Sequence, residues 1–462
     1  MESDSAARRS QQLAVVSSSA EAAAVDIAPP ASGLAASPPA AIVVAAPAAA
    51  QPPLPEIQVP EEDERLEPWL AHVSVLVHLA TFAIIGVLIR YGLEVLFGPE
   101  VAHVTDDEQT VFIDLPANIA GSFIMGVVGV AAKRHIAAYS EHLAIGLATG
   151  LCGCITTFAS WNQRMLAILA SGLWVRALAG YIVGACALPL SACVVTSLLL
   201  CACAALSVSV HSPLLPICQP APMFSPIPAL LPPPLLCWHA GAALPFVSLM
   251  AGIDFADGIK WQIKRANDRR TARGKPPLRA PRSDHFDRRW ASLLLFFCLS
   301  VFLVTAAAIG TALDDWSSKT RRLWFACVVA APGAWLRWYL SWLNGGAVGK
   351  GRWWQWVPVG TVAANVSASV LEAALSTVVL AYNSVESVLA VGAIQLGFLG
   401  SLSTVSTLMV EVLALHKAKT GRCWRPYFYL YGVTILPSFL LGILVYCVPV
   451  WVLDYTSKYN HL

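Results

Sequence analysis

Long runs of apolar residues separated by short polar segments dominate the chain from about residue 69 onward. Each run reaches the roughly 20 residues that a helix needs to cross the apolar core of a bilayer. The pattern therefore predicts an all-α polytopic membrane protein. Its nine expected spans lie near 69–95, 111–132, 139–168, 174–208, 290–311, 322–343, 355–381, 388–415 and 427–452.

The polar and small residues inside these runs recur at a fixed interval. Three pairs of segments align when the chain is shifted by 247 positions (337 − 90, 365 − 118 and 397 − 150). They are GVLIRYGL (86–93) with GAWLRWYL (333–340), PANIAGSFIMG (116–126) with AANVSASVLEA (363–373), and GLCGCITTFASW (150–161) with GFLGSLSTVSTL (397–408). Three matches at one interval predict a duplicated four-helix unit with a site between its two copies.

Positive charge orients the expected spans, because cytosolic loops are enriched in Lys and Arg. Basic residues at 133–134, 260–275, 350–352 and 417–425 share one side if the second repeat is inverted relative to the first. The span at 290–311 then supplies the single crossing that links the repeats. This topology places the N-terminus in the cytosol and the C-terminus outside the cell.

One apolar segment, 231–253, would upset this parity if it crossed the membrane. Three consecutive prolines and His239 disfavour a buried helix there, which favours a loop or a surface-lying segment. The expected organisation has five parts. They are a disordered Ala/Pro/Ser-rich tail (1–66), a first repeat (67–210), a Pro-rich and then basic cytosolic linker (211–289), a linker helix (290–311) and an inverted second repeat (312–455).

Composition excludes several function classes. Hydrophobic residues make up 57% of the chain and charged residues 13%, and the formal net charge of +2 gives no general attraction for nucleic acid. The chain has no nucleotide-binding loop, catalytic-triad pattern or metal-ligand cluster, so we do not expect an enzyme. The 12 cysteines fall largely in apolar spans and predict no disulfide framework.

The third segment of each repeat carries the strongest chemical signal. Glycines and hydroxyl residues in mid-membrane weaken a helix, and its recurrence favours a broken third helix in each repeat over a simple small-residue contact. A break exposes carbonyls that can hold a small cation, and donors that can hold an anion. Carbonyls of Gly153, Thr156, Gly400 and Ser403 would surround one point.

Two further pairs of polar residues allow two interpretations each. Asn118 and Asn365 can donate to an anion, or can form ordinary interhelical hydrogen bonds. Arg90 and Arg337 can make vestibules at opposite faces electropositive, or can snorkel to the interface.

These motifs resemble those of the Fluc or CrcB fluoride channels, and the two-domain form resembles the eukaryotic fluoride exporters known as FEX. GVLIR, NIAGS and GLCGCITTFASW carry the resemblance, of which the last is the most specific. It implies a passive fluoride channel at the plasma membrane, a single-chain pseudo-dimer in the lipid bilayer that exports fluoride from the cytosol. It also implies a central structural sodium ion on the backbone carbonyls of Gly153, Thr156, Gly400 and Ser403.

The resemblance further implies which residues line the pores. Phe158 matches the first pore phenylalanine, Trp161 replaces the second, and Asn118 and Asn365 match the pore asparagine. The remaining expected pore residues are hydroxyl-bearing: Thr157, Ser160, Thr404, Ser406, Thr407, Tyr181 and Tyr429. The two tyrosines also suit an aromatic belt.

The second repeat departs from the family pattern, with Val405 and Leu408 where phenylalanines belong. Aromatic ring edges carry partial positive charge, whereas valine and leucine offer an anion nothing. We therefore expect one working pore and one vestigial pore. Two other functions stay open: a proton-coupled transporter of small anions or drugs built from inverted repeats, and a scaffold that keeps only the fold.

Overall fold

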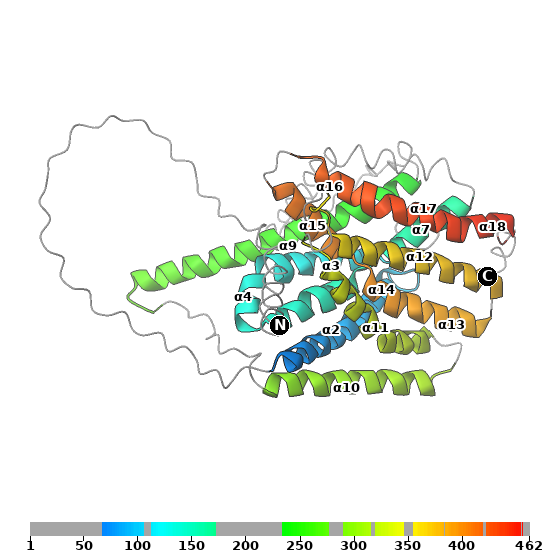
Figure 1. Ribbon diagram of the computed structural model, residues 1–462. Coiled ribbons are helices and arrows are strands. Elements are labelled where there is room, and N and C mark those ends of the chain that lie inside the picture. The colour runs from blue at the N-terminus through cyan, green and yellow to red at the C-terminus, as the bar shows by residue number, and fades with distance from the viewer. Residues whose placement is uncertain are drawn as a thin grey trace, which may run out of the picture.

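The computed structural model describes residues 67–105, 112–171, 233–276, 290–315, 319–345, 354–382, 384–418, 422–453 and 455. All regular elements within these ranges are helices (Figure 1), as predicted. Eight are long and apolar enough to cross a membrane, and a bent pair, Leu115–Ala131 with Lys133–Tyr139, raises the number to nine. The protein is therefore a polytopic α-helical membrane protein.

The first repeat begins with one long helix and continues in shorter, partly π-helical pieces. Pro68 stands in the first turn of the opening helix, where its missing N–H costs nothing. The elements are α2 (Pro68–Phe97), α3 (Leu115–Ile124), η2 (Met125–Ala131), α4 (Lys133–Tyr139), α5 (Glu141–Ile145), η3 (Gly146–Cys152), α6 (Gly153–Ile155) and α7 (Ala159–Ala170).

The second repeat has a similar order of elements. A capping box of Ser384 and Ser387 starts its third span. The elements are α11 (Lys319–Ser341), α12 (Val359–Tyr382), α13 (Val385–Ile394), η5 (Gln395–Leu399), α14 (Gly400–Leu402), α15 (Ser406–Lys417), α16 (Arg425–Tyr427), η6 (Phe428–Ile435), α17 (Leu436–Gly442), η7 (Ile443–Cys447) and α18 (Val448–Val452).

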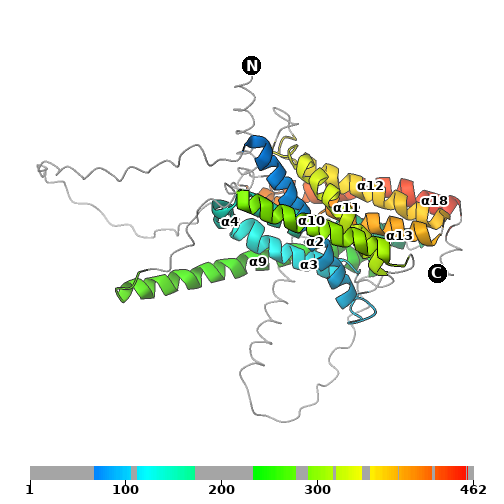
Figure 2. The ribbon, with the colours of Figure 1, turned by 90° about the horizontal axis from the view of Figure 1, so that it is seen from below.

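Eight of the nine predicted spans correspond to these helices and to the linker helix α10 (Trp290–Leu313). The expected span at 174–208 lies outside the described residues, as does the predicted tail at 1–66. In Figure 1, α10 runs along the lower edge of the bundle, and in Figure 2, seen from below, it lies across the front of the bundle; it packs on α2 and α11.

Of the two expectations for 231–253, a loop or a surface-lying segment, the loop was wrong, because residues 233–253 are helical. Residues Pro233–Ala272 form α9, a single helix of 40 residues whose part from Gly241 onward could itself cross a membrane. Two of the prolines that argued against a helix occupy its first two positions, where proline is tolerated. Figures 1 and 2 both show the far end of α9 projecting beyond the bundle.

Close contacts fix α9 against the first repeat. The Ser248 hydroxyl donates to the Ile119 carbonyl at 2.8 Å, and Lys260 Nζ donates to the Ala131 carbonyl at 2.8 Å. Gly126 and Gly252 let the backbones approach, because a Cβ on either would overlap the facing helix. Helix α9 packs on α3 of the first repeat and on α15 of the second. In the same way, α17 packs on α12 of the second repeat and on α7 of the first.

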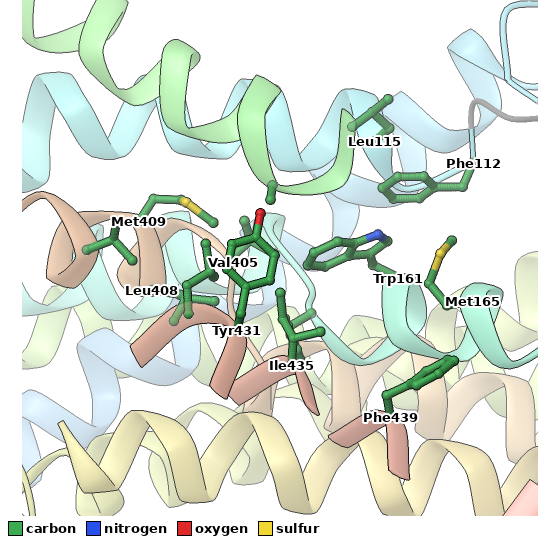
Figure 3. Close-up of a cluster of buried hydrophobic side chains, with 14 of the residues drawn as sticks. Phe112, Leu115, Trp161, Met165, Val405, Leu408, Met409, Tyr431, Ile435 and Phe439 are labelled. Atoms are coloured by element: carbon green, nitrogen blue, oxygen red, sulfur yellow. The ribbon is translucent and has the colours of Figure 1, made fainter. Parts of the chain in front are cut away.

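The two repeats share one interior. The first helices of the repeats, α2 and α11, pack along each other, and Trp335 Nε1 donates to the Leu76 carbonyl across them at 2.9 Å. A large apolar cluster combines side chains from both copies, including Trp161 and Met165 of the first and Val405 and Leu408 of the second (Figure 3). The third spans of both repeats therefore end up buried side by side.

Candidate functional site

The third span of each repeat is interrupted at the predicted place. Helix α6 ends at Ile155 and α7 begins at Ala159, while α14 ends at Leu402 and α15 begins at Ser406. Thr156 and Ser403 leave the helical conformation, with ψ angles of 144° and 160°. Each hydroxyl bonds the carbonyl four residues back, at 3.1 Å for Thr156 and 3.0 Å for Ser403.

An asparagine on the neighbouring helix holds each break. Asn118 Nδ2 donates to the Thr157 carbonyl at 3.1 Å, and its Oδ1 accepts from the Thr157 amide at 2.8 Å. Asn365 makes the same two bonds with Thr404, also at 3.1 and 2.8 Å. These asparagines thus replace two backbone hydrogen bonds that the interrupted helix loses.

The two breaks also hold each other through crossed hydroxyl contacts. The Ser403 hydroxyl accepts from the backbone amides of Phe158 and Ala159, both at 3.2 Å. In the opposite direction, the Thr156 hydroxyl accepts from the Ser406 amide at 3.2 Å. The first hydroxyl residue of each break, Thr156 or Ser403, therefore caps the helix that restarts after the break in the other repeat.

Further hydroxyl pairs lie at the same crossing. Thr156 Oγ1 lies 3.2 Å from Thr404 Oγ1 and 3.0 Å from Ser406 Oγ, and Thr157 Oγ1 lies 3.1 Å from Ser403 Oγ. All five side chains are fully buried. The amides and carbonyls freed in a span must find partners inside the protein. Here they do so through side chains of both repeats, which joins the two breaks by a dense network of hydroxyl hydrogen bonds.

The aromatic side chains expected at the pore lie directly beside this crossing. Phe158 and Trp161 are both buried, with ring centroids 5.5 Å apart and planes at 88°. In such an edge-to-face pair the positive edge of one ring points at the negative face of the other. Together with Asn162, Met165 and Ile435 these rings line a gap too small to hold a water molecule.

The corresponding positions of the second repeat are apolar. Val405 and Leu408 are fully buried in the shared apolar cluster. In the view of Figure 3 they gather with Met409 on one side of Tyr431, while Trp161 and Met165 lie on its other side. The two breaks thus have similar backbones but different side-chain chemistry around them.

Both arginines are buried at the contact between the repeats, and neither is placed at a vestibule. Arg90 is 1% exposed and Arg337 5% exposed. Arg90 Nη2 donates to the Leu396 carbonyl of the second repeat, and Arg337 Nη2 donates to the Thr149 carbonyl of the first. The accepting residues are also 247 positions apart (396 − 149), so the two contacts are equivalent.

Arg337 binds two of the backbone oxygens that are expected to hold sodium, and both arginines lie against the glycines at that site. Arg337 Nη1 donates to the carbonyl of Gly153 at 2.8 Å and to that of Ser403 at 3.2 Å. A Cβ at Gly153 would overlap the Arg337 guanidinium, and a Cβ at Gly400 would overlap that of Arg90. With a guanidinium on two of the four carbonyls, the arrangement does not fit a sodium ion bound to the same oxygens.

A second polar cluster, in the second repeat, was missed at the level of sequence. Tyr429 donates its hydroxyl to Glu411 Oε2, and Thr361 donates to Glu411 Oε1 at 2.6 Å. Asn344 Nδ2 approaches the same oxygen at 3.3 Å. Tyr429 therefore binds the carboxylate of Glu411 on α15. The available signal was the carboxylate of Glu411 within an apolar span.

The remaining expected pore residues are placed as follows. Ser160 and Thr407 are half-buried at the starts of α7 and α15, where their hydroxyls lie 3.4 Å from those of Thr157 and Thr404. Tyr181 lies outside the described residues. No group of three or more metal-ligating side chains occurs within the described ranges.

Comparison with known proteins gives the same duplication. A family model described as "CrcB-like protein, Camphor Resistance (CrcB)" matches residues 77–206 and again residues 324–449. The second match spans α11 to α18, while the first ends before α9 begins.

Similar curated proteins each match about a fifth of the chain. A protein of Sorangium cellulosum named "Fluoride-specific ion channel FluC" is 32% identical over 99 residues, which are 20% of this chain and 69% of that protein. Proteins of the same name from Marinobacter nauticus and Leptospira interrogans are 32% and 33% identical over 98 residues, 21% of this chain and 72% of each relative. No solved structure matches the chain.

Proposed function

The chain belongs to the CrcB-like family, and from this membership we propose that it is a passive, fluoride-selective ion channel that exports fluoride from the cytosol. The relatives named as fluoride-specific channels support this assignment at the level of the family. The two family matches in one chain support a single-chain pseudo-dimer. In this proposal fluoride is the partner, and the chain itself carries out no chemical reaction.

The observation that carries the proposal is the pair of Thr157 and Thr404 hydroxyls at the crossing of the two breaks, beside Phe158 and Trp161; within the described residues neither hydroxyl donates to a carbonyl. Fluoride is small and strongly hydrated, so a pore must replace the water that it removes. Hydroxyl groups can turn their O–H bonds toward an anion, and ring edges add partial positive charge. An apolar surround strengthens both contributions because the local dielectric constant is low.

We propose that only one of the two pores conducts. The support is the difference between Phe158 and Trp161 in the first repeat and Val405 and Leu408 in the second. A path lined by aliphatic side chains gives a dehydrated anion no compensation, so it stays closed to fluoride. The second path would then be vestigial, although its helix break is kept.

The proposed setting is the plasma membrane, with the N-terminus in the cytosol and the C-terminus outside, which requires that only one of the two segments, 174–208 or α9, crosses the membrane. The basic end of α9, which contains Lys260, Lys264 and Arg265, supports a cytosolic position for that end of the helix. A membrane potential negative inside would drive fluoride outward with about 2.3 kcal/mol per charge per 100 mV.

The test is fluoride efflux from liposomes that hold the purified full chain, read with a fluoride electrode. A potassium gradient with valinomycin sets the voltage, and chloride-loaded liposomes serve as the selectivity control. We expect rapid, voltage-driven release of fluoride without release of chloride. Release that requires an opposing proton gradient would instead support the coupled transporter.

A substitution separates channel activity from leakage. We expect Phe158→Ala to lower fluoride efflux, whereas the exposed Arg265→Gln on α9 should leave it unchanged. If the folded wild-type protein releases no fluoride under any gradient, the proposal fails and the scaffold function is favoured.

A further inference from the structure

A single guanidinium joins the two broken helices at the centre of the protein. Arg337 Nη1 donates to the Gly153 carbonyl of the first repeat and to the Ser403 carbonyl of the second. Its Nη2 donates to the Thr149 carbonyl. One side chain thus connects three carbonyl oxygens from the third spans of both repeats.

These oxygens lie where helical backbone ends. Ser403 follows the last residue of α14, and Thr149 and Gly153 lie in the last turns before the break at Thr156. The carbonyl end of a helix carries partial negative charge, which attracts a cation. In the buried interior that charge needs a permanent partner, because no water screens it. A guanidinium, which stays protonated in proteins, can supply it.

Arg337 has no carboxylate partner among the residues that the structure describes. The equivalent Arg90 differs, because its Nε lies 3.6 Å from Glu94 Oε1. Ser341 stands where the second repeat would need the counterpart of Glu94 (341 − 94 = 247). Arg337 is therefore a monovalent charge balanced by carbonyl dipoles, as a bound monovalent ion would be.

A second cation on the same oxygens would be strongly disfavoured. Two unit charges about 4 Å apart repel by about 4 kcal/mol at an effective dielectric constant of about 20. A sodium ion touching the Gly153 and Ser403 carbonyls would lie at about this distance from the Arg337 guanidinium, since Nη1 is 2.8 Å and 3.2 Å from those oxygens.

We infer that the Arg337 guanidinium is the central cation of this protein and takes the place of the sodium ion implied by the family resemblance. The protein therefore needs no sodium for stability. Where it conducts fluoride, which rests on the proposed function, it also needs no sodium for conduction.

The first experiment measures thermal unfolding of the purified full chain in detergent. Sodium chloride is compared with potassium chloride and with N-methylglucamine chloride at equal ionic strength. A ligand that binds only the folded state raises the midpoint as its concentration rises. We expect the same midpoint in all three salts. A midpoint raised by sodium alone would overturn the inference.

Two variants extend the test. We expect Arg337→Gln to lower the midpoint and to gain a rise specific to sodium, because the Gly153 and Ser403 carbonyls then lack their cation. Arg265→Gln removes an exposed arginine and should do neither. If Arg337→Gln does not fold, the salt comparison on the wild-type protein still decides the question.

A transport measurement separates this inference from the proposed function. Fluoride efflux from liposomes prepared with N-methylglucamine on both sides should equal efflux in sodium. Efflux that disappears without sodium would overturn the inference while supporting a fluoride channel. Absence of efflux in every salt would count against the channel, and the unfolding comparison would still stand.

Discussion

Asn118 binds Thr157 at two points, through the carbonyl at 3.1 Å and the amide at 2.8 Å. The pairing of Asn365 with Thr404 repeats both distances. The equality shows that the second repeat keeps the backbone of the break although its pore aromatics are gone. The asparagines therefore serve the structure of the break in both repeats, independent of which side conducts.

We expect Asn118→Ala to lower the free energy of unfolding by about 1–3 kcal/mol, because it leaves the Thr157 amide and carbonyl buried without partners. Asn365→Ala should cost about the same, since its bonds are equivalent. Asn162→Ala is the matched control, because that amide makes one long contact, 3.5 Å to the Ser438 carbonyl. Denaturation in detergent micelles measures all three, and a cost confined to Asn118 would contradict the structural role.

The difference between the pores gives a prediction about transport. Phe158→Ala should lower fluoride efflux about tenfold, which corresponds to roughly 1.4 kcal/mol in the barrier, the upper range for an aromatic contact. Val405→Ala, the equivalent change in the second repeat, should alter efflux less than about twofold on the same scale. Liposome efflux at a fixed voltage measures both, and equal losses would show that both paths conduct.

Two glycines of helix α9 offer a test, because alanine should change the stability of the protein in opposite directions at the two positions. A Cβ at Gly252 would overlap the Phe123 carbonyl of α3, while one at Gly258 would meet nothing within 4 Å. We expect Gly252→Ala to destabilise the protein by about 1–3 kcal/mol through overpacking. Gly258→Ala should stabilise it by up to about 1 kcal/mol, the difference in helix propensity. Thermal unfolding measures both, and two stabilising changes would mean that α9 does not pack on α3.

Much of the fold follows from local patterns in the sequence. Apolar length alone located eight spans, and the run of Gly, Thr and Ser at 150–160 located the break, because both effects act within one helix. Helix α9 was missed because prolines at 232–234 were taken as helix breakers. Position within the helix decides their effect, and Pro233 starts the helix where no backbone donor is needed.

The arginines show why part of the site could not be predicted from sequence. The 247-residue interval identified Arg90 and Arg337 as equivalent, but not what they contact. Their acceptors, the carbonyls of Leu396 and Thr149, belong to the opposite repeat. Every residue has a backbone carbonyl, so the residue type does not show which carbonyls act as acceptors. Only the packing of the two repeats reveals that both arginine side chains point inward.

The contact between Arg90 and Gly400 can be tested by a double-mutant cycle. A methyl group at Gly400 would overlap the Arg90 guanidinium, which is buried and bound to the Leu396 carbonyl. Gly400→Ala should therefore destabilise the wild-type protein, and less so in an Arg90→Met background, where no guanidinium must move. For residues in contact we expect a coupling energy of about 0.5–3 kcal/mol. Gly92→Ala is the control, because a Cβ there meets nothing within 4 Å although it lies on the same helix as Arg90. Unfolding free energies of the four proteins measure the coupling, and strictly additive costs would place the Arg90 guanidinium away from Gly400.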